Sequence, residues 1–288
     1  MFTGLEDLPV LGCGVSLSFG MKPDPVALAR AAGGPAFIEY AGPASHVDVL
    51  PHVQDLPVPV LFHPSCLNLC GPWPNPPEWL KAVDAHCKAV DTPWLAQDVA
   101  VCFVGDTPGY STSLGYFVPP ILSQHGLAEA IARVTEVRRA VDRPLLLEPA
   151  PVTYRTGPLS IWTWLQKLAE ATDCGLLLDA GHVFSHQLAE GKDSLEPLDL
   201  SRVVELHVAG GILRDGLYID AHDLPILPEV WELFEHLVAN TPNLRAICLE
   251  CEGGAAHTVL PVLRQLRERA WLLASNEELR RVLRSQLS

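Results

Sequence analysis

The chain has 288 residues, of which 48% are hydrophobic and 19% charged, a length that one α/β barrel with a large core commonly reaches. Its 34 acidic residues outnumber its 20 Lys and Arg residues, so the formal net charge is −14. This balance argues against nucleic acid as a partner, because proteins that bind phosphate backbones present a basic face.

The N-terminal sequence has neither the basic region nor the apolar stretch of a secretory signal. No apolar run is long enough to cross a bilayer. The sequence therefore predicts a cytoplasmic protein that does not bind a membrane, with its eight cysteines reduced. Cys248 and Cys251 form a C-x-x-C pair, but on a strand they would face opposite sides, so we expect no shared metal or redox role.

Short apolar runs alternate with segments of helical spacing along the whole chain. The apolar runs cover residues 11–18, 36–40, 58–63, 94–99, 144–148, 176–179, 203–207 and 246–250. The helical segments cover residues 24–33, 77–90, 125–141, 159–172, 228–239 and 257–272. Buried strands alternating with helices predict an α/β protein with a (β/α)8 TIM barrel. An open doubly wound sheet is the alternative, but it would usually bring a longer glycine-rich turn than Gly12-Cys13-Gly14.

We expect a single domain over residues 1–288. Residues 11–272 would form the barrel, and residues 273–288 would form a C-terminal helix that docks on it. Two long segments, 66–76 and 102–124, are predicted to be loops that follow strand ends. Both would lie on the catalytic face of a barrel, where long loops are usually functional.

Polar side chains stand where the apolar runs end. Asp179 closes the run 176–179, His182 follows one turn later, and His207 closes the run 203–207. A buried strand needs the apolar run but not the carboxylate or the imidazole. The same pattern recurs at the other strand ends and in an Asp-x-His pair after the seventh strand, at Glu39, His63, Asp98, Glu148, Asp220, His222 and Glu250. In a closed barrel these side chains would converge on the mouth.

Carboxylates and imidazoles crowded in one mouth repel or protonate one another unless a cation lies among them. No Lys or Arg stands at these strand ends, so a metal is the simplest neutraliser. Mixed His and carboxylate ligands suit Fe, Mn, Zn or Co, and more than four ligands indicate more than one metal. The predicted metal ligands are His63, Asp98, Glu148, Asp179, His182, His207, Asp220, His222 and Glu250. We expect His125, His186 and His257 to be surface or helix-start residues instead.

The segment from Arg202 through His207 to Gly210 resembles the R-V-x-E-I-H-L-A-G segment of the DUF692 family, the multinuclear non-haem iron-dependent oxidative enzymes. The stretch Ile219–Pro225, followed by Val230 and Trp231, is similar to the family's I-D-T-H-x-x-P…V-W pattern. Looser matches are Phe37-Ile-Glu39, Phe62-His63-Pro-Ser-Cys-Leu67, Glu148 followed by Tyr154, Leu176-Leu-Leu-Asp179 and Cys248-Leu-Glu250.

The resemblance implies a xylose-isomerase-like TIM barrel that holds two or three iron ions, Fe2+ or Fe3+, at its mouth. It also implies O2-dependent oxidation of cysteine in a ribosomally synthesised peptide, with a small partner protein that binds the peptide's leader. Beside the ligands, Glu39, Glu205 and Tyr154 would be supporting residues.

Four departures mark a divergent member of that family. The family's S-E-H on strand four is Gln97-Asp98 here, and an Asn after strand six is replaced by His182. Pro149 replaces an Asn after the strand-five Glu, and Gly211 replaces the His of an A-G-H turn. The sequence therefore leaves the number of metals open.

Two other functions share part of this evidence. Glu148, Asp179-x-x-His182, His207 and Glu250 also match sugar isomerases and epimerases of the same fold, which hold one Mn2+ or Co2+. There the two glutamates would act as an acid–base pair. A non-catalytic barrel that acts as a binding subunit is the third interpretation. His182 is the residue over which the two enzyme interpretations divide.

Overall fold

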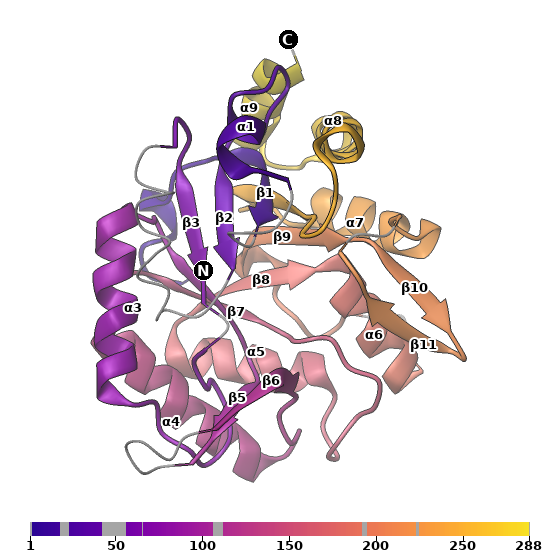
Figure 1. The fold of residues 1–288 in the computed structure, drawn as a ribbon. Coiled ribbons are helices and arrows are strands. Elements are labelled where there is room, and N and C mark those ends of the chain that lie inside the picture. The colour runs from indigo at the N-terminus through magenta and orange to yellow at the C-terminus, as the bar shows by residue number, and fades with distance from the viewer. Residues whose placement is uncertain are drawn as a thin grey trace.

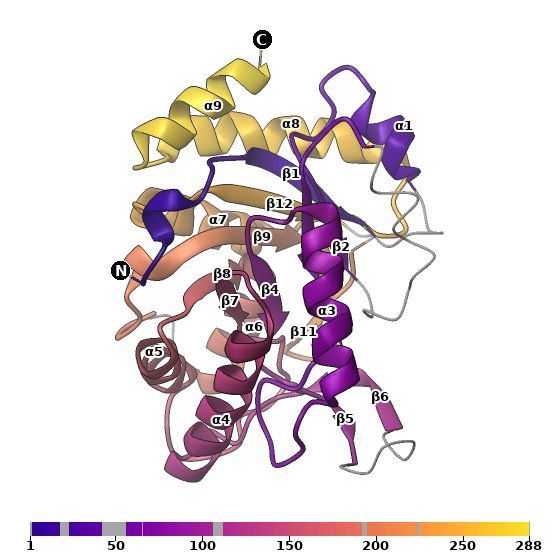
Figure 2. The same cartoon turned by 90° about the vertical axis from the view of Figure 1, so that its left-hand side faces the viewer.

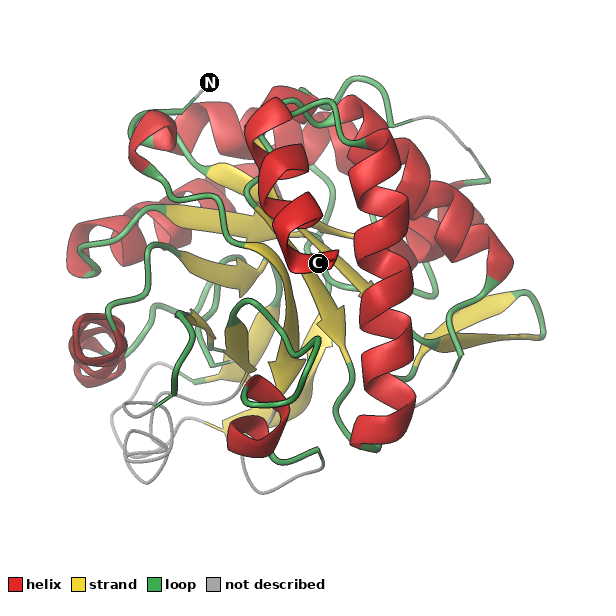
Figure 3. Cartoon of the chain, turned by 90° about the horizontal axis from the view of Figure 1, so that it is seen from above, coloured by secondary structure: helices red, strands yellow, loops and turns green. Residues whose placement is uncertain are grey.

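The computed structural model describes residues 2–17, 23–41, 56–64, 66–105, 112–191, 195–222 and 225–287. Its centre is a closed barrel of eight parallel strands in the order β1-β12-β9-β8-β7-β4-β3-β2, with helices outside it (Figures 1 and 3). The barrel strands are β1 (Gly12–Leu17), β2 (Ile38–Ala41), β3 (Val60–His63), β4 (Leu95–Asp98), β7 (Leu145–Glu148), β8 (Gly175–Asp179), β9 (Val203–Ala209) and β12 (Ala246–Glu250). Each strand coincides with one predicted apolar run, so the TIM-barrel prediction is confirmed and the open sheet is wrong.

The outer layer contains α1 (Pro25–Ala29), α3 (Pro77–Val90), α4 (Gln124–Ala140), α5 (Ile161–Thr172), α6 (Ala180–Glu190), α7 (Pro228–Asn240), α8 (Ala256–Leu273) and α9 (Glu277–Leu287). Helix α1 is shorter than the predicted 24–33, since it ends before a turn in which Gly33 has φ of +71°. The sequence did not predict α6, because the small residues Ala180 and Gly181 are typical of a turn. It begins directly after β8, where the carboxylate of Asp179 accepts a bond from the backbone N–H of His182 at 2.8 Å and caps the helix.

The barrel interior is packed with apolar side chains at the N-terminal end of the strands. Trp94, Leu146 and Leu177 are fully buried there, and the N-terminal residues Phe2 and Leu5 join the same cluster. The Nε1–H of Trp94 donates to Oε2 of Glu205 at 2.7 Å, and both side chains are fully buried. Burial and the nearby Glu39 carboxylate raise the pKa of Glu205, which means that they disfavour its charged form. The hydrogen bond from Trp94 gives this buried carboxyl group a donor.

Trp94→Phe is expected to destabilise the protein by about 1–3 kcal/mol, because it leaves the buried Glu205 oxygen without its donor. Urea unfolding followed by far-UV circular dichroism measures the loss. Trp271→Phe, on the half-buried surface of α8, is the control and should cost less. Equal costs for the two variants would mean that the Trp94–Glu205 bond contributes nothing.

Helix α9 docks as predicted for the C-terminal helix. It packs against α8 and β1, with Leu279 and Leu283 fully buried (Figure 2). The Gln286 side chain accepts from the backbone N–H of Cys13 at 3.1 Å and donates to the carbonyl of Leu11 at 3.0 Å. The last helix is therefore held to the first barrel strand by hydrogen bonds as well as by apolar contact.

Two β-hairpins lie outside the barrel, β5 (Val101–Val104) with β6 (Thr112–Val118) and β10 (Gly211–Arg214) with β11 (Leu217–Asp220). The prediction of a loop over 102–124 is wrong, because the β-forming residues that end β6 pair with β5 despite the neighbouring glycines. Residues 106–111 of that segment lie outside the described residues. The β10–β11 hairpin projects from the barrel (Figure 1). Within the described ranges, no helix has the length and apolar character needed to cross a bilayer.

Candidate metal centre

The polar strand ends meet at the C-terminal mouth of the barrel. Strand register places Asp98 beside Glu148 and Asp179 beside His207. A cavity of about 340 Å³ opens there, and its walls include His63, Asp98, Glu148, His182, Asp220, His222 and Glu250. Parallel strands bring their carboxyl ends to one edge, which is why residues far apart in sequence share this site.

His63, at the end of β3, contacts carboxylates from three other strands, β2, β4 and β7. Its Nε2 lies 3.2 Å from Oδ2 of Asp98 and 3.3 Å from Oε2 of Glu148, while its Nδ1 lies 3.6 Å from Oε1 of Glu39. Burial lowers the pKa of this ring, but the hydrogen bond to Asp98 and the charges of Glu148 and Glu39 outweigh burial and raise the pKa well above its ordinary value. The ring therefore occupies a strongly negative pocket.

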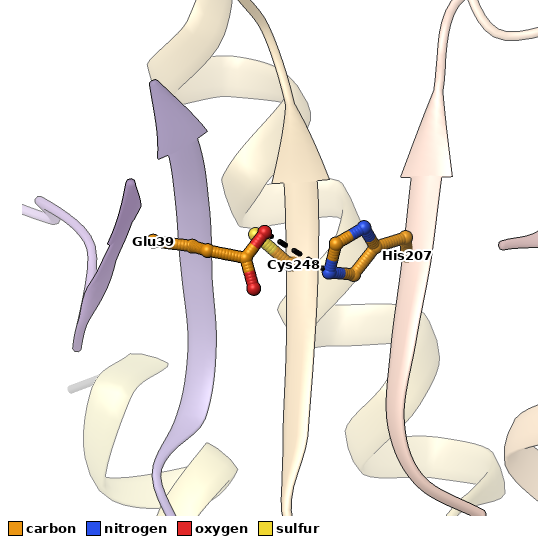
Figure 4. Close-up of side chains that lie close together, drawn as sticks. All are labelled: Glu39, His207 and Cys248. Carbon is orange, nitrogen blue, oxygen red and sulfur yellow. Dashed lines mark ion pairs between the residues drawn. The ribbon is translucent and has the colours of Figure 1, made fainter. Parts of the chain in front are cut away.

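His207 lies in a second part of the same pocket. Its Nε2 is 3.3 Å from Oε1 of Glu39 and its Nδ1 is 3.4 Å from Oε1 of Glu250. Figure 4 shows Glu39 and His207 pointing toward one another, with the thiol of Cys248 beside them. Burial and the Glu39 carboxylate raise the pKa of this thiol well above its ordinary value. Cys248 faces the barrel interior whereas Cys251 packs with the outer core, so the two cysteines face opposite sides as predicted.

His182 is drawn into the cluster from the start of α6. Its Nδ1 lies 3.1 Å from the carbonyl of Pro149 and 3.0 Å from Oε1 of Glu148, and its Nε2 lies 3.4 Å from Oδ2 of Asp220. A ring nitrogen held by a backbone carbonyl, with the other nitrogen facing a carboxylate, here that of Asp220, is typical of a metal-ligating histidine. The two oxygens of Asp179 have different surroundings. Oδ1 caps α6, whereas the buried Oδ2 has no hydrogen-bond partner and is free to bind a metal.

Asp220 and His222 close the site from the end of β11. Oδ2 of Asp220 lies 3.0 Å from Nε2 of His222, whose Nδ1 lies 2.6 Å from Oε2 of Glu252. Burial lowers the pKa of His222, but the charge of Glu250 and the bonds to Asp220 and Glu252 raise it to about 12. Sequence reasoning missed Glu252, although it stands two residues after Glu250 and its parity was a usable signal.

The carboxyl groups of the site differ in the direction in which their surroundings shift the pKa. Burial and the charge of Asp98 raise the pKa of Glu148 to about 7. Burial also raises the pKa of Asp179. At Glu250 burial acts in the same direction, but His222 and His207 outweigh it and lower the pKa to about 2. The pKa values of these carboxyl groups are therefore shifted in both directions from their ordinary values, and such shifts are typical of functional sites.

The donor set fits bound metal. Eight carboxyl groups face four histidines, and among the described residues every ion pair of the site carboxylates is with histidine rather than Lys or Arg. Several buried site atoms lack a hydrogen-bond partner: both Glu39 oxygens, Asp98 Oδ1, Asp179 Oδ2, His207 Nδ1 and Nε2, Asp220 Oδ1 and Glu250 Oε2. Such atoms cost free energy unless an ion completes them.

The structure brings all nine predicted ligands together, with Glu39 and Glu205 beside them. It does not bring in Tyr154, whose side chain is 57% exposed. His125 and His257 are exposed as expected, but the surface prediction for His186 is wrong. His186 is buried on α6, and its Nε2–H donates to the carbonyl of Ala150 at 3.0 Å, because that face of α6 packs on the loop after β7.

Solved structures with the same fold belong to several enzyme classes. A xylose isomerase domain-containing protein of Salmonella typhimurium LT2 superposes with a TM-score of 0.54 at 15% identity, covering 97% of this chain and 98% of that one. Endonuclease IV of Thermus thermophilus gives 0.54 at 15%, covering 89% and 99%. A D-psicose 3-epimerase gives 0.53 at 12%, covering 96% and 99%. These likenesses establish a xylose-isomerase-like TIM barrel.

Sequence relatives carry the family name UPF0276. One from Rhizobium meliloti (strain 1021) is 29% identical over 191 residues, which is 63% of this chain and 60% of the relative. One from Paraburkholderia phytofirmans is 37% identical over 131 residues, 41% of this chain and 43% of the relative. The chain thus spans about half of the length of the curated relatives it matches. Residues 36–268 match the model of a family described as RiPP precursor modification enzyme MbnB/TglH/ChrH, and the chain belongs to that family, which confirms the resemblance found in the sequence.

Proposed function

We propose that this chain is an iron-dependent enzyme that uses O2 to oxidise cysteine residues of a ribosomally synthesised peptide. One observation carries the proposal, namely that the ligand groups form a chain of clusters too large for one ion. Glu39, His207 and Cys248 form one group, His63, Glu148 and His207 a second, and Asp98, Glu148 and His182 a third, each with ligand atoms within 4.8 Å of one another. Glu148 and His207 each belong to two of these groups, and ligands shared between neighbouring groups are expected of a multinuclear centre.

A fourth group, His222, Glu250 and Glu252, adjoins the others, because Glu250 lies 3.4 Å from His207. Asp220 also lies between His222 and His182, within 3.4 Å of each ring. Iron held by these histidines and carboxylates would supply the redox chemistry that O2 and a cysteine side chain require. The protein's part is to hold the ring nitrogens and carboxylate oxygens in place. The Pro149 carbonyl fixes the ring of His182, and the helix cap fixes the carboxylate of Asp179.

The family description supports a peptide as the substrate. The 340 Å³ cavity is bordered by Phe117 from β6 and Pro151 from the loop after β7, which offer apolar contact to a peptide at the rim. The cavity would place a cysteine thiol beside the ligand groups and orient it for reaction. A small partner protein that delivers the leader of the peptide belongs to the same proposal.

A sugar isomerase or epimerase with one Mn2+ or Co2+ is the second candidate. The close contact of Glu148 with His182, on a fold shared with a D-psicose 3-epimerase, is the observation in its favour. It leaves His63, Asp220 and His222 without a role, although all three contact the central carboxylates or His182. A non-catalytic subunit leaves the whole group of unpaired buried atoms without a role.

His63→Ala is expected to lower the iron content by about one ion per chain, because the ring contacts both Asp98 and Glu148 and belongs to one ligand group with Glu148 and His207. Inductively coupled plasma mass spectrometry of protein loaded anaerobically with Fe2+ measures the change. His125→Ala is the control, since His125 is exposed. A single-metal isomerase does not use His63, so an unchanged metal content in His63→Ala would favour that alternative.

A further inference from the structure

A second cavity, of about 380 Å³, adjoins the metal centre. It lies between α7, α8 and the C-terminal end of β12. Its walls come from Trp231 of α7, Val259 and Val262 of α8, Leu249 of β12 and Ile226. We call it the side pocket. Its volume is in the range of pockets that enclose a small molecule or a large side chain.

The side pocket meets the metal-centre cavity at two residues. His222 and Glu250 line both spaces, so a molecule that occupies the first cavity lies next to the opening of the second. Beyond these two residues the walls are mainly aliphatic and aromatic. Among the described residues that line the pocket, only His222 and Glu250 are charged, so the pocket favours an apolar group over a charged one.

The walls are braced before any ligand arrives. The guanidinium of Arg269 stacks over the Trp231 ring at 4.5 Å and pairs with Glu235 on the same helix as Trp231. Val259 is buried and anchors α8 against the barrel. A preformed apolar pocket binds without the entropic cost of ordering its walls, which raises affinity for a matching group.

We propose that the side pocket is a specificity subsite that binds an apolar side chain of the substrate peptide, aliphatic or aromatic, adjacent to the reacting cysteine. This inference rests on the proposed function, because that function places the cysteine in the neighbouring cavity. An extended peptide advances about 3.3 Å per residue, and successive side chains point to opposite faces, so the side chain next to the cysteine is directed out of the first cavity. His222 and Glu250 are the residues that it would cross to enter the side pocket. The pocket thus selects peptides by the residue beside the cysteine.

The test uses two series of hexapeptides, Ac-Gly-Gly-Cys-Xaa-Gly-Gly-NH2 and Ac-Gly-Gly-Xaa-Cys-Gly-Gly-NH2, with Leu, Phe, Ala or Asp at Xaa. Calorimetry on the iron-loaded, O2-free protein gives each affinity. In one of the series we expect Leu or Phe to bind about 10- to 100-fold more tightly than Ala, and Asp to bind most weakly, from the burial of one side chain. Val262→Phe fills the pocket from α8 and should remove this preference without changing the iron content. Leu272→Phe adds the same bulk on the 68% exposed part of α8 and should preserve the preference.

The outcomes separate this inference from the proposed function. Equal affinities for Leu, Phe and Ala peptides, no binding of any peptide at millimolar concentration, or an unchanged preference in Val262→Phe would overturn the subsite, even in a protein that binds iron. A Leu or Phe preference that persists when Ser replaces the cysteine, in a protein without iron, would support the subsite while contradicting the iron chemistry.

Discussion

Glu148→Gln is expected to lower peptide oxidation at least about 100-fold and to remove at least one iron per chain. Glu148 is the carboxylate that two ligand clusters share, with Oε2 3.3 Å from His63 and Oε1 3.0 Å from His182. Gln keeps the shape but offers a neutral oxygen and an N–H donor, which repels a cation. Mutation of a residue that only supports a metal ligand typically lowers metal affinity or activity about 10- to 100-fold, and loss of a shared ligand should lower them more.

The same substitution should not unfold the metal-free protein, because it removes a carboxyl group whose ionisation burial disfavours. Circular dichroism and the melting temperature of the metal-free variant check this point. Glu229→Gln, on the exposed first turn of α7, is the matched control and should retain full activity and iron. Normal turnover in Glu148→Gln would exclude Glu148 from the centre.

Removal of metal is the second large effect, and it should lower the melting temperature by about 5 °C or more. The ions bind the folded chain and not the unfolded one, so at about 100-fold excess over Kd a single site stabilises by about 2.7 kcal/mol. For a chain of this size one kcal/mol corresponds to a shift of about 2 °C or somewhat more. Without the ions, the buried Glu39, Asp98 and Asp179 keep oxygens that nothing satisfies.

Differential scanning calorimetry before and after dialysis against a chelator measures that shift, and readdition of Fe2+ should reverse it. His207→Ala is the comparison, since His207 belongs to two clusters and its loss should remove most of the chelator effect. A wild-type melting temperature that does not respond to chelator or Fe2+ would show that the site does not bind metal in solution.

The barrel was predictable because each buried parallel strand leaves the same local signal, an apolar run that stops at a polar residue. Val203–Ala209 and Gly175–Asp179 illustrate it, and their register then brings His207 beside Asp179. Sequence could not predict the β10–β11 hairpin, which carries Asp220 to the mouth, because its exposed apolar residues follow no core periodicity. Leu213, Leu217 and Ile219 are each at least 40% exposed.

The candidate site residues were predicted from the same strand pattern, and the errors arose where that pattern ended or did not apply. Parity along β12 identified Glu250, and the same parity extended past the strand end leads to Glu252. Tyr154 came only from a spacing similar to that of a known motif, and the chain after β7 turns its ring to solvent. His182 could not be resolved from sequence, because its position depends on α6 beginning immediately at Asp179.

The central claim is that this mouth holds a multinuclear iron centre. The most direct measurement is the metal content per chain of protein loaded anaerobically with Fe2+ and purified from excess metal, with an optical spectrum taken as a cysteine-containing peptide is added. A multinuclear centre predicts two or three irons per chain and a new thiolate-to-iron absorption band. One Mn2+ or Co2+ per chain, with no iron retained and no such band, would contradict it.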